Sequence, residues 1–248
     1  MRCTFRLNLE TLVQTIFFQN HFLFFRAKSV NDTHSREEIC KIGASLYARG
    51  FVHASAGNIS IKLPDGSFLI TPTDACLGSL VSQDLAHVSA AGEQLSGLRA
   101  SKTIILHRSI YESEPHATCV IHAHCTNLVS LTLQGVWQES AIIPPITPYF
   151  VMKVGRIPWV AYHRPGDPKV AIQVKNFINE GIKTNKPIRG VMLDRLGPVI
   201  WHKSPFLASA VLEELEETAK LWLLSHRQVE PLNEHHIEEL RVHFGAIW

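Results

Sequence analysis

The sequence predicts a single α/β domain built on a mixed, largely antiparallel sheet flanked by helices. Three observations lead to this prediction. The chain has 248 residues, enough to bury one large core, and it contains neither an internal repeat nor a Pro/Gly/Ser-rich linker. Segments with helical periodicity alternate with short apolar runs typical of strands. A tight turn, Pro64-Asp65-Gly66, joins two of those runs directly, as in a β-hairpin.

The first predicted element is a helix that begins near Ser35 and ends at Gly50. Ser35 and Glu38 have the spacing of a capping box, and Ile39 and Ile42 begin an apolar stripe at helical spacing. Residues 1–34 are therefore expected to lie outside the domain, as a poorly packed appendage or the product of an upstream start codon.

Six Phe residues fall within positions 1–30, but polar residues interrupt every apolar run there. No run approaches the roughly 18 to 20 apolar residues that a membrane-spanning helix needs. Only Arg2 and Arg6 match a secretory signal peptide, which also requires a clean apolar centre and a cleavage site. The alternative to an appendage is an aromatic helix that docks on a partner or a membrane surface.

The other elements are predicted in chain order from the helical spacing of apolar residues and from the alternation typical of strands. The predicted strands are Asn58–Lys62, Phe68–Thr71, Thr118–His124, Ile188–Leu193 and Val199–His202, and Val88–Ser96 is predicted to hold another short strand and a turn. The predicted helices are Lys102–Ser113, Asn127–Leu133, Pro168–Gly181 and Pro205–Ser225. A Pro-rich loop leads into Tyr149–Val154, and the last helix carries acids early and Lys220 late, as the helix dipole favours. The domain is expected to span residues 35–226, with a charged, peripheral tail over 227–248.

Composition and charge exclude several classes of protein. Hydrophobic residues make up 46% of the chain and charged residues 19%, which indicates a folded body rather than a disordered one. The formal charge of +2 gives no basic excess for nucleic acid. The five Cys residues include no CxxC pair, which argues against a disulfide framework and a cysteine zinc site. A reducing, cytoplasmic location is therefore expected.

His122 and His124 are the most specific local feature. Residues two apart on a strand project to the same face, so the two imidazoles could bind one metal ion. Because the chain has 14 His residues, such a pair also arises by chance, and the alternative is a half-exposed pair without a ligand.

Three segments could bind phosphate. The Gly57-Asn58 pair and the turn over residues 71–74 offer backbone N–H groups and small polar side chains. Ser101 and Lys102 open a helix, where free N–H groups and the dipole favour an anion. The alternatives are plain turns and ordinary helix capping.

The order of motifs resembles the class II aldolase/adducin family over roughly Ser35–Leu224, most closely its branch of 3-oxo-tetronate 4-phosphate decarboxylases. The motifs are AGNIS, LITPTD, SKT, VIHAH, PPITPYFVMKVG, YHRPGDP, LGPV and EELEETAKL. The resemblance implies an αβα sandwich assembled as a homotetramer, with one divalent metal ion per subunit, usually zinc, in a cleft between subunits. It also implies a phosphorylated sugar acid as substrate, with neither a nucleic acid nor a membrane as partner.

Residue by residue, the resemblance assigns metal ligation to His122 and His124. It assigns phosphate contacts to Gly57, Asn58, Thr73, Ser101 and Lys102. Tyr149 matches a tyrosine that some members present to the neighbouring subunit's site as a proton donor. The alternative for Tyr149 is packing at a Pro-rich subunit contact.

Two positions depart from the family pattern. Thr103 stands where many members carry an acid/base Glu, and Leu196 stands where the third His ligand usually precedes a Gly. Catalytic zinc normally has three protein ligands, so another group must substitute or the metal is lost. His107, His202 and, more remotely, His163 could move in, although each could equally be a packed or surface His.

We therefore take Thr103 and His107, with Tyr149, as candidate catalytic residues and His202 as the candidate third ligand. The expected reaction is decarboxylation, because a β-keto acid carries its own electron sink and tolerates the missing Glu. Aldol cleavage or epimerisation of a sugar phosphate is the enzymatic alternative. A catalytically silent, adducin-like binding protein that has lost its metal is the alternative from another class.

Overall fold

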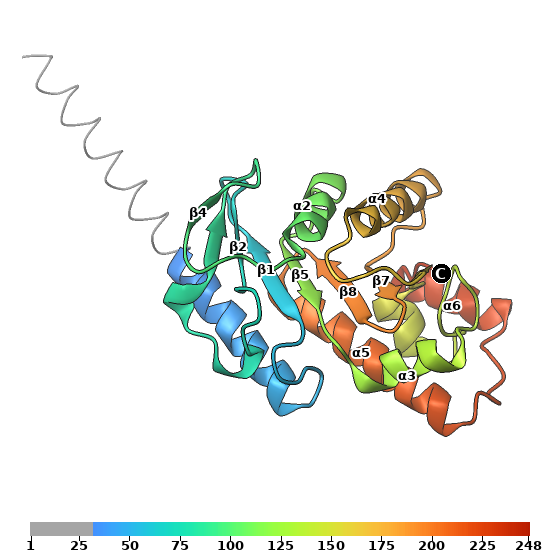
Figure 1. Ribbon diagram of the computed structural model, residues 1–248. Coiled ribbons are helices and arrows are strands. Elements are labelled where there is room, and N and C mark those ends of the chain that lie inside the picture. Colours follow the sequence, from blue (N-terminus) through green and yellow to red (C-terminus); the bar gives the residue numbers. More distant parts are fainter. Residues whose placement is uncertain (1–31) are drawn as a thin grey trace, which may run out of the picture.

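The computed structural model describes residues 32–248 and is built on one eight-stranded sheet (Figure 1). The strand order is β4-β3-β2-β1-β5-β8-β7-β6. Only β6 and β7 pair in parallel, and the other neighbours are antiparallel. The predicted mixed, largely antiparallel sheet is confirmed. The predictions for residues 1–31 lie outside the described residues.

Most element bounds lie within a few residues of the expected ones, but residues 86–96 form two strands joined by a turn, and the strand Trp159–Val160 and the helix Glu234–Phe244 were not predicted. The strands are β1 Asn58–Lys62, β2 Phe68–Ile70, β3 Ala86–Val88, β4 Gln94–Ser96, β5 Cys119–His122, β6 Trp159–Val160, β7 Gly190–Leu193 and β8 Gly197–His202. The helices are a first one over residues 32–48, then α2 Ile104–Ser113, α3 Thr126–Gln134, α4 Pro168–Lys183, α5 Pro205–Leu224 and α6 Glu234–Phe244. Three short turns complete the set: η1 Leu77–Ser79, η2 Ser82–Asp84 and the π-helical η3 Phe150–Val154.

Helices cover both faces of the sheet. Figure 1 shows α2 and α4 together on one face, while α3 and α5 lie on the other. The buried apolar residues accordingly form two clusters, one against α2 and α4 and one against the first helix, α3, α5 and α6. Neighbours on β5 alternate between them, since Val120 belongs to the first cluster and Ile121 to the second. The arrangement is the predicted αβα sandwich.

Two boundary predictions are wrong. The first helix is already formed at residue 32, so Ser35 lies inside it and is not its N-cap. The tail over 227–248 is not peripheral, because Ile237 and Trp248 are buried in the core. The Trp248 ring contacts that of Phe150, with the centroids 5.5 Å apart. The many charges of the tail obscured these apolar anchors, whose burial stabilises the docked position.

No helix in the part of the chain from residue 32 onward is long and apolar enough to cross a membrane.

Gly197, at the start of β8, lets that strand approach β5 beside the two histidines. Its φ is +134°, and a Cβ there would lie 2.0 Å from the Ala123 carbonyl oxygen. We expect Gly197→Ala to lower the free energy of unfolding by about 3 kcal/mol, measured by urea denaturation. Gly135→Ala is the matched control, since Gly135 also has a positive φ (+94°) but no atom within 4 Å of the added Cβ. That variant should lose about 1 kcal/mol, and equal losses would contradict the prediction.

Candidate active site

The imidazoles of His122 and His124 converge at the end of β5, as the spacing predicts. Their ring centroids lie 4.9 Å apart and their Nε2 atoms 3.2 Å apart. His122 is buried, and its Nδ1 donates to the Pro198 carbonyl oxygen at 2.9 Å. This bond places the one ring proton of a neutral imidazole on Nδ1, so the Nε2 lone pair of His122 faces His124.

This pair fits a divalent metal ion. Two nitrogen ligands of a tetrahedral zinc, each about 2.0 to 2.1 Å from the metal, lie about 3.3 Å apart, close to the observed Nε2 separation. A second ring nitrogen donating to a backbone carbonyl is typical of metal-bound His. Burial, with a smaller effect from His124, lowers the pKa of His122 to about 3, and burial also lowers the pKa of His124. Both rings are therefore neutral, the form that binds metal.

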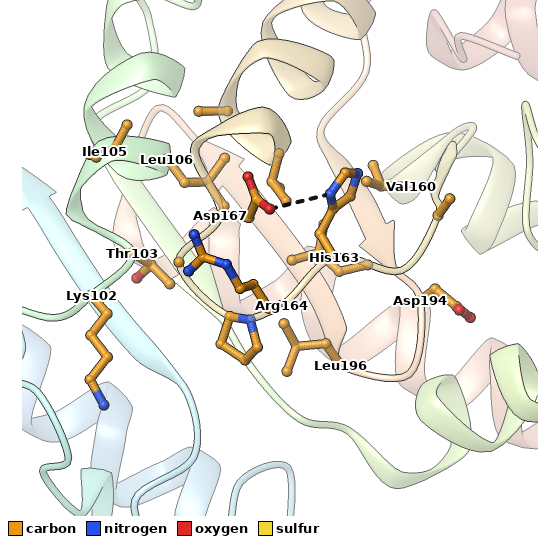
Figure 2. Close-up of a pocket in the computed structure, with 16 residues that line it drawn as sticks. Lys102, Thr103, Ile105, Leu106, Val160, His163, Arg164, Asp167, Asp194 and Leu196 are labelled. Atoms are coloured by element: carbon orange, nitrogen blue, oxygen red, sulfur yellow. Dashed lines mark ion pairs between the residues drawn. The ribbon is translucent and has the colours of Figure 1, made fainter.

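The third ligand is not in place. Among residues 32–248, no group of three or more His, Cys, Asp or Glu side chains is positioned to hold a metal ion. Leu196, in the turn between β7 and β8, packs against the cluster beneath α2 and α4. It also lines a pocket with Thr103, Arg164 and Asp194 (Figure 2).

His202 does not reach the pair, which corrects its prediction as a ligand. It pairs with Cys119, whereas Val199 is the residue of β8 opposite His122. Three residues of extended chain separate these positions by about 10 Å. His202 follows the turn closely in sequence, but β8 carries it to the other end of the sheet.

His163 does not face the pair either. Its Nε2 lies 3.2 Å from the Gln173 amide nitrogen, and its Nδ1 lies 3.8 Å from the Asp167 carboxylate. Figure 2 shows its ring directed toward Asp167 across the pocket.

The three candidate phosphate-binding segments meet beside the histidine pair. The Ser101 N–H donates to the Thr71 carbonyl at 3.2 Å, and the Thr103 hydroxyl donates to Asn58 Oδ1 at 2.9 Å. Thr73 is held by its N–H, which donates to the Arg99 carbonyl at 2.9 Å. We call residues 57–58, 71–73 and 101–103 the polar cradle. Its phosphate-binding role stays a prediction.

Two members of the cradle need separate comment. A Cβ on Gly57, whose φ is +84°, would lie 2.8 Å from the His122 carbonyl oxygen, so this turn requires glycine. Lys102 is exposed, and its Nζ lies 3.4 Å from the Asp74 carboxylate. Figure 2 shows the Lys102 side chain extending away from Arg164 and Asp167.

A buried hydrogen-bond chain runs from Tyr111 to Asn58. The Tyr111 hydroxyl and Ser60 Oγ are 2.7 Å apart, as are Ser60 Oγ and His107 Nδ1, and His107 Nε2 is 2.6 Å from Asn58 Oδ1. An amide oxygen only accepts, so His107 donates from Nε2 and accepts at Nδ1. Ser60 therefore donates to His107, and Tyr111 donates to Ser60. We call these four residues the donor chain.

The donor chain changes the roles predicted for His107 and Thr103. His107 is fully buried with both ring nitrogens engaged, and burial, aided by His122, lowers its pKa to about 3. It is therefore neutral, and its role as a proton-transfer group stays a prediction. Together with Thr103 it directs two hydrogens at Asn58 Oδ1, which leaves the amide NH2 of Asn58 unused by these two donors. Thr103 bonds Ser101 as well, at 3.0 Å, and its hydroxyl is part of the cradle.

His107 should make stability pH-dependent. Its pKa is about 3 when folded and about 6.5 when unfolded, so the unfolded chain takes up a proton first as the pH falls. The contribution is complete above pH 6.5 and is lost progressively toward pH 3. Between pH 6 and 4 we expect the free energy of unfolding to fall by about 1.4 kcal/mol per pH unit more in the wild type than in His107→Gln. Urea denaturation measures both slopes. His235→Gln, at an exposed position, should keep the wild-type slope, and a His107→Gln slope equal to it would refute the assignment.

Tyr149 directly precedes η3, and its side chain is 62% exposed. Among residues 32–248, the hydrogen-bond partners of His122 and His124 do not include Tyr149. Its role in a neighbouring subunit's site stays a prediction.

Three residues of this region were missed by sequence reasoning. Ser60 and Tyr111 are hidden in an ordinary strand and helix, and only three-dimensional packing shows that they meet His107. His53, in the loop over residues 51–57, has its ring 6.3 Å from that of His124. It is one of 14 His residues and has no motif spacing, so no local pattern marks it as part of the site.

The chain is similar to known proteins over most of the domain. A family model described as the class II aldolase and adducin N-terminal domain matches residues 37–223. A 3-oxo-tetronate 4-phosphate decarboxylase of Cupriavidus necator is 55% identical over 188 residues, which cover 76% of this chain and 83% of that protein. The enzyme of the same name in Escherichia coli K12 is 41% identical, over 83% of this chain and 94% of that protein. The crystal structure of YgbL from Klebsiella pneumoniae superimposes with a TM-score of 0.78 at 40% identity, covering 85% of this chain and 99% of that one.

Proposed function

This chain belongs to the class II aldolase and adducin family, and from that premise we propose that it decarboxylates a 3-oxo-tetronate 4-phosphate in sugar-acid catabolism. The products are dihydroxyacetone phosphate and CO2. The observation that carries the proposal is the adjacency of two neutral, convergent imidazoles and a cradle of hydrogen-bond donors. Asn58 in the cradle is the direct β-sheet partner of His122, so a small substrate can touch both. The names of the relatives support the choice of substrate.

The substrate phosphate binds in the polar cradle. The Asn58 amide, the Thr73 hydroxyl and the amino-terminal end of α2 present donors to its oxygens, beside Ser101, whose own hydroxyl donates to Thr103. Lys102 adds a positive charge at the exposed rim, where it favours capture of the dianion. The phosphate thereby fixes which end of the substrate faces His122.

Decarboxylation breaks the bond between the carboxylate carbon and its neighbour. The electron pair passes to the adjacent keto group, CO2 departs, and the remaining carbon takes up a proton. A divalent cation held by His122 and His124, zinc in our proposal, would supply Lewis acidity toward the keto and neighbouring hydroxyl oxygens. Tyr149 from an adjacent subunit is the proposed proton donor. No carboxylate base is needed, which agrees with Thr103 at the position of the missing Glu.

We further propose a cytoplasmic homotetramer with active sites at subunit interfaces. The exposed Tyr149 ring supports an interface near η3. The cysteines at positions 40, 76, 119 and 125 are free thiols, which agrees with a reducing compartment.

The test uses the purified full-length chain, loaded with Zn²⁺ and supplied with each stereoisomer of 3-oxo-tetronate 4-phosphate. We expect equal amounts of CO2 and dihydroxyacetone phosphate. Metal-loaded protein that releases no CO2 from either isomer would overturn the proposal. An aldehyde released from a sugar phosphate would instead establish aldol cleavage, and a protein that neither binds metal nor turns over substrate would be the silent alternative.

A further inference from the structure

The His122/His124 pair needs a third protein ligand, and the position that would supply it carries Leu196. An aliphatic side chain has no donor atom for a metal. A catalytic zinc held by only two protein ligands would be weakly bound, because such sites normally supply three. The geometry around the pair therefore has to offer a different donor.

His53 is the imidazole placed to supply it. Its ring lies edge-on to that of His124, at an interplanar angle of 76° and a centroid distance of 6.3 Å. In a tetrahedral site each coordinated ring has its centroid about 3.2 Å from the metal, so two such rings have centroids about 5 Å apart. His122 and His124, at 4.9 Å, already have this spacing. His53 is about 1 Å too far from His124, which explains why the three do not form a ligand group as they stand.

The loop that carries His53 is held beside the pair, while the His53 side chain is exposed. The Ala56 N–H donates to the His53 carbonyl at 2.9 Å, and Gly57 passes against the His122 carbonyl. Val52 is buried in the core and anchors the loop on its other side. Because the ring itself is exposed, rotation of its side chain can close the remaining gap without unpacking the core.

The other donors nearby are already committed. Both ring nitrogens of His107 are engaged in the donor chain. Cys125 follows His124 but is fully buried in the core cluster. The Glu216 carboxylate accepts from the Asn127 and Leu128 backbone N–H groups at 2.9 and 3.1 Å, and so caps α3.

We propose that His53 is the third protein ligand of the divalent metal, in place of the histidine that Leu196 replaces. This inference rests on the metal site of the proposed function, but not on the identity of the substrate. It predicts that the metal site draws on the loop 51–57 as well as on β5. The start of β8 then contributes the Pro198 carbonyl that orients His122, and the turn before it contributes no ligand.

The test measures metal binding directly, with Co²⁺ as the probe and the full chain freed of metal beforehand. Affinity is determined by competition with a chelator, and coordination by the visible absorption of the bound cobalt. We expect His53→Gln to weaken Co²⁺ binding by about 100-fold or more and to lower the intensity of the visible bands. His202→Gln, at the other end of β8, should bind as the wild type does. Wild-type affinity in His53→Gln would overturn the proposal, as would a wild-type chain that binds no Co²⁺.

A second variant gives a signature that only contact with the metal can produce. In His53→Cys, the thiolate should add a sulfur-to-cobalt charge-transfer band in the near ultraviolet, whereas His202→Cys should add none. Absence of the band in His53→Cys protein that is folded by circular dichroism would also contradict the proposal. If metal binding depends on His53 but no CO2 is released from the substrate, the proposed decarboxylase activity is contradicted. The assignment of His53 as a metal ligand is then still supported.

Discussion

Replacing His124 by Asn is expected to lower kcat/KM for decarboxylation by about 1,000-fold or more, equivalent to about 4 kcal/mol of transition-state stabilisation. The variant loses one of the two imidazoles whose Nε2 atoms are spaced for a metal ion. The ion would be lost or displaced, and with it the Lewis acidity toward the keto oxygen. Initial rates of CO2 release and the zinc content of the same preparation measure the effect.

Stability should change little in this variant, because His124 is only partly buried and Asn is smaller. His202→Asn is the matched control, since it removes a half-buried imidazole from a neighbouring strand and should retain both zinc and activity. A His124→Asn enzyme with full activity and no zinc would show that the pair has no catalytic part.

Replacing Asn58 by Asp should raise KM by about 100-fold while kcat changes much less. The substitution keeps an oxygen that accepts from His107 and Thr103, but replaces the amide NH2 with a second carboxylate oxygen. A donor to the phosphate thus becomes a like charge, at a cost of about 3 kcal/mol. Steady-state kinetics and competition by inorganic phosphate measure the change.

The unphosphorylated 3-oxo-tetronate provides the control for this prediction. It offers no phosphate to the cradle, so wild type and Asn58→Asp should process it at similar, slow rates. If the variant is impaired equally with both substrates, Asn58 acts on the reacting carbons or on folding rather than on the phosphate.

Local patterns were sufficient for most of the fold. The hairpin of β1 and β2 follows from the Pro64-Asp65-Gly66 turn, and α4 begins at Pro168 behind an Asp167 cap, as its sequence indicates. The parallel pairing of β6 with β7 could not be read in the same way, because β6 has only two residues and no periodicity of its own. The docked tail was missed because its short apolar end follows a charged stretch, and the burial of Trp248 depends on a distant partner, Phe150.

The site residues likewise fall into those that a local sequence pattern reveals and those that only tertiary packing brings together. His122 and His124 could be found from the sequence, since alternation along a strand is a local property. His202 was misplaced because its nearness to the Gly197 turn in sequence is undone by the length of β8. His53 and Tyr111 have no local signal, because each meets the site only through the packing of another segment against β1 or β5.

The order of donors from Tyr111 through Ser60 and His107 to Asn58 fixes how the Asn58 amide is bonded, which would give the polar cradle a built-in preference for an anion. None of these links can reverse without leaving a buried group unsatisfied, so the proposed preference for an anion would not depend on surface cations. Exchange of Lys102 for a neutral residue would then slow the arrival of the ligand, while the discrimination against cationic or neutral analogues would persist.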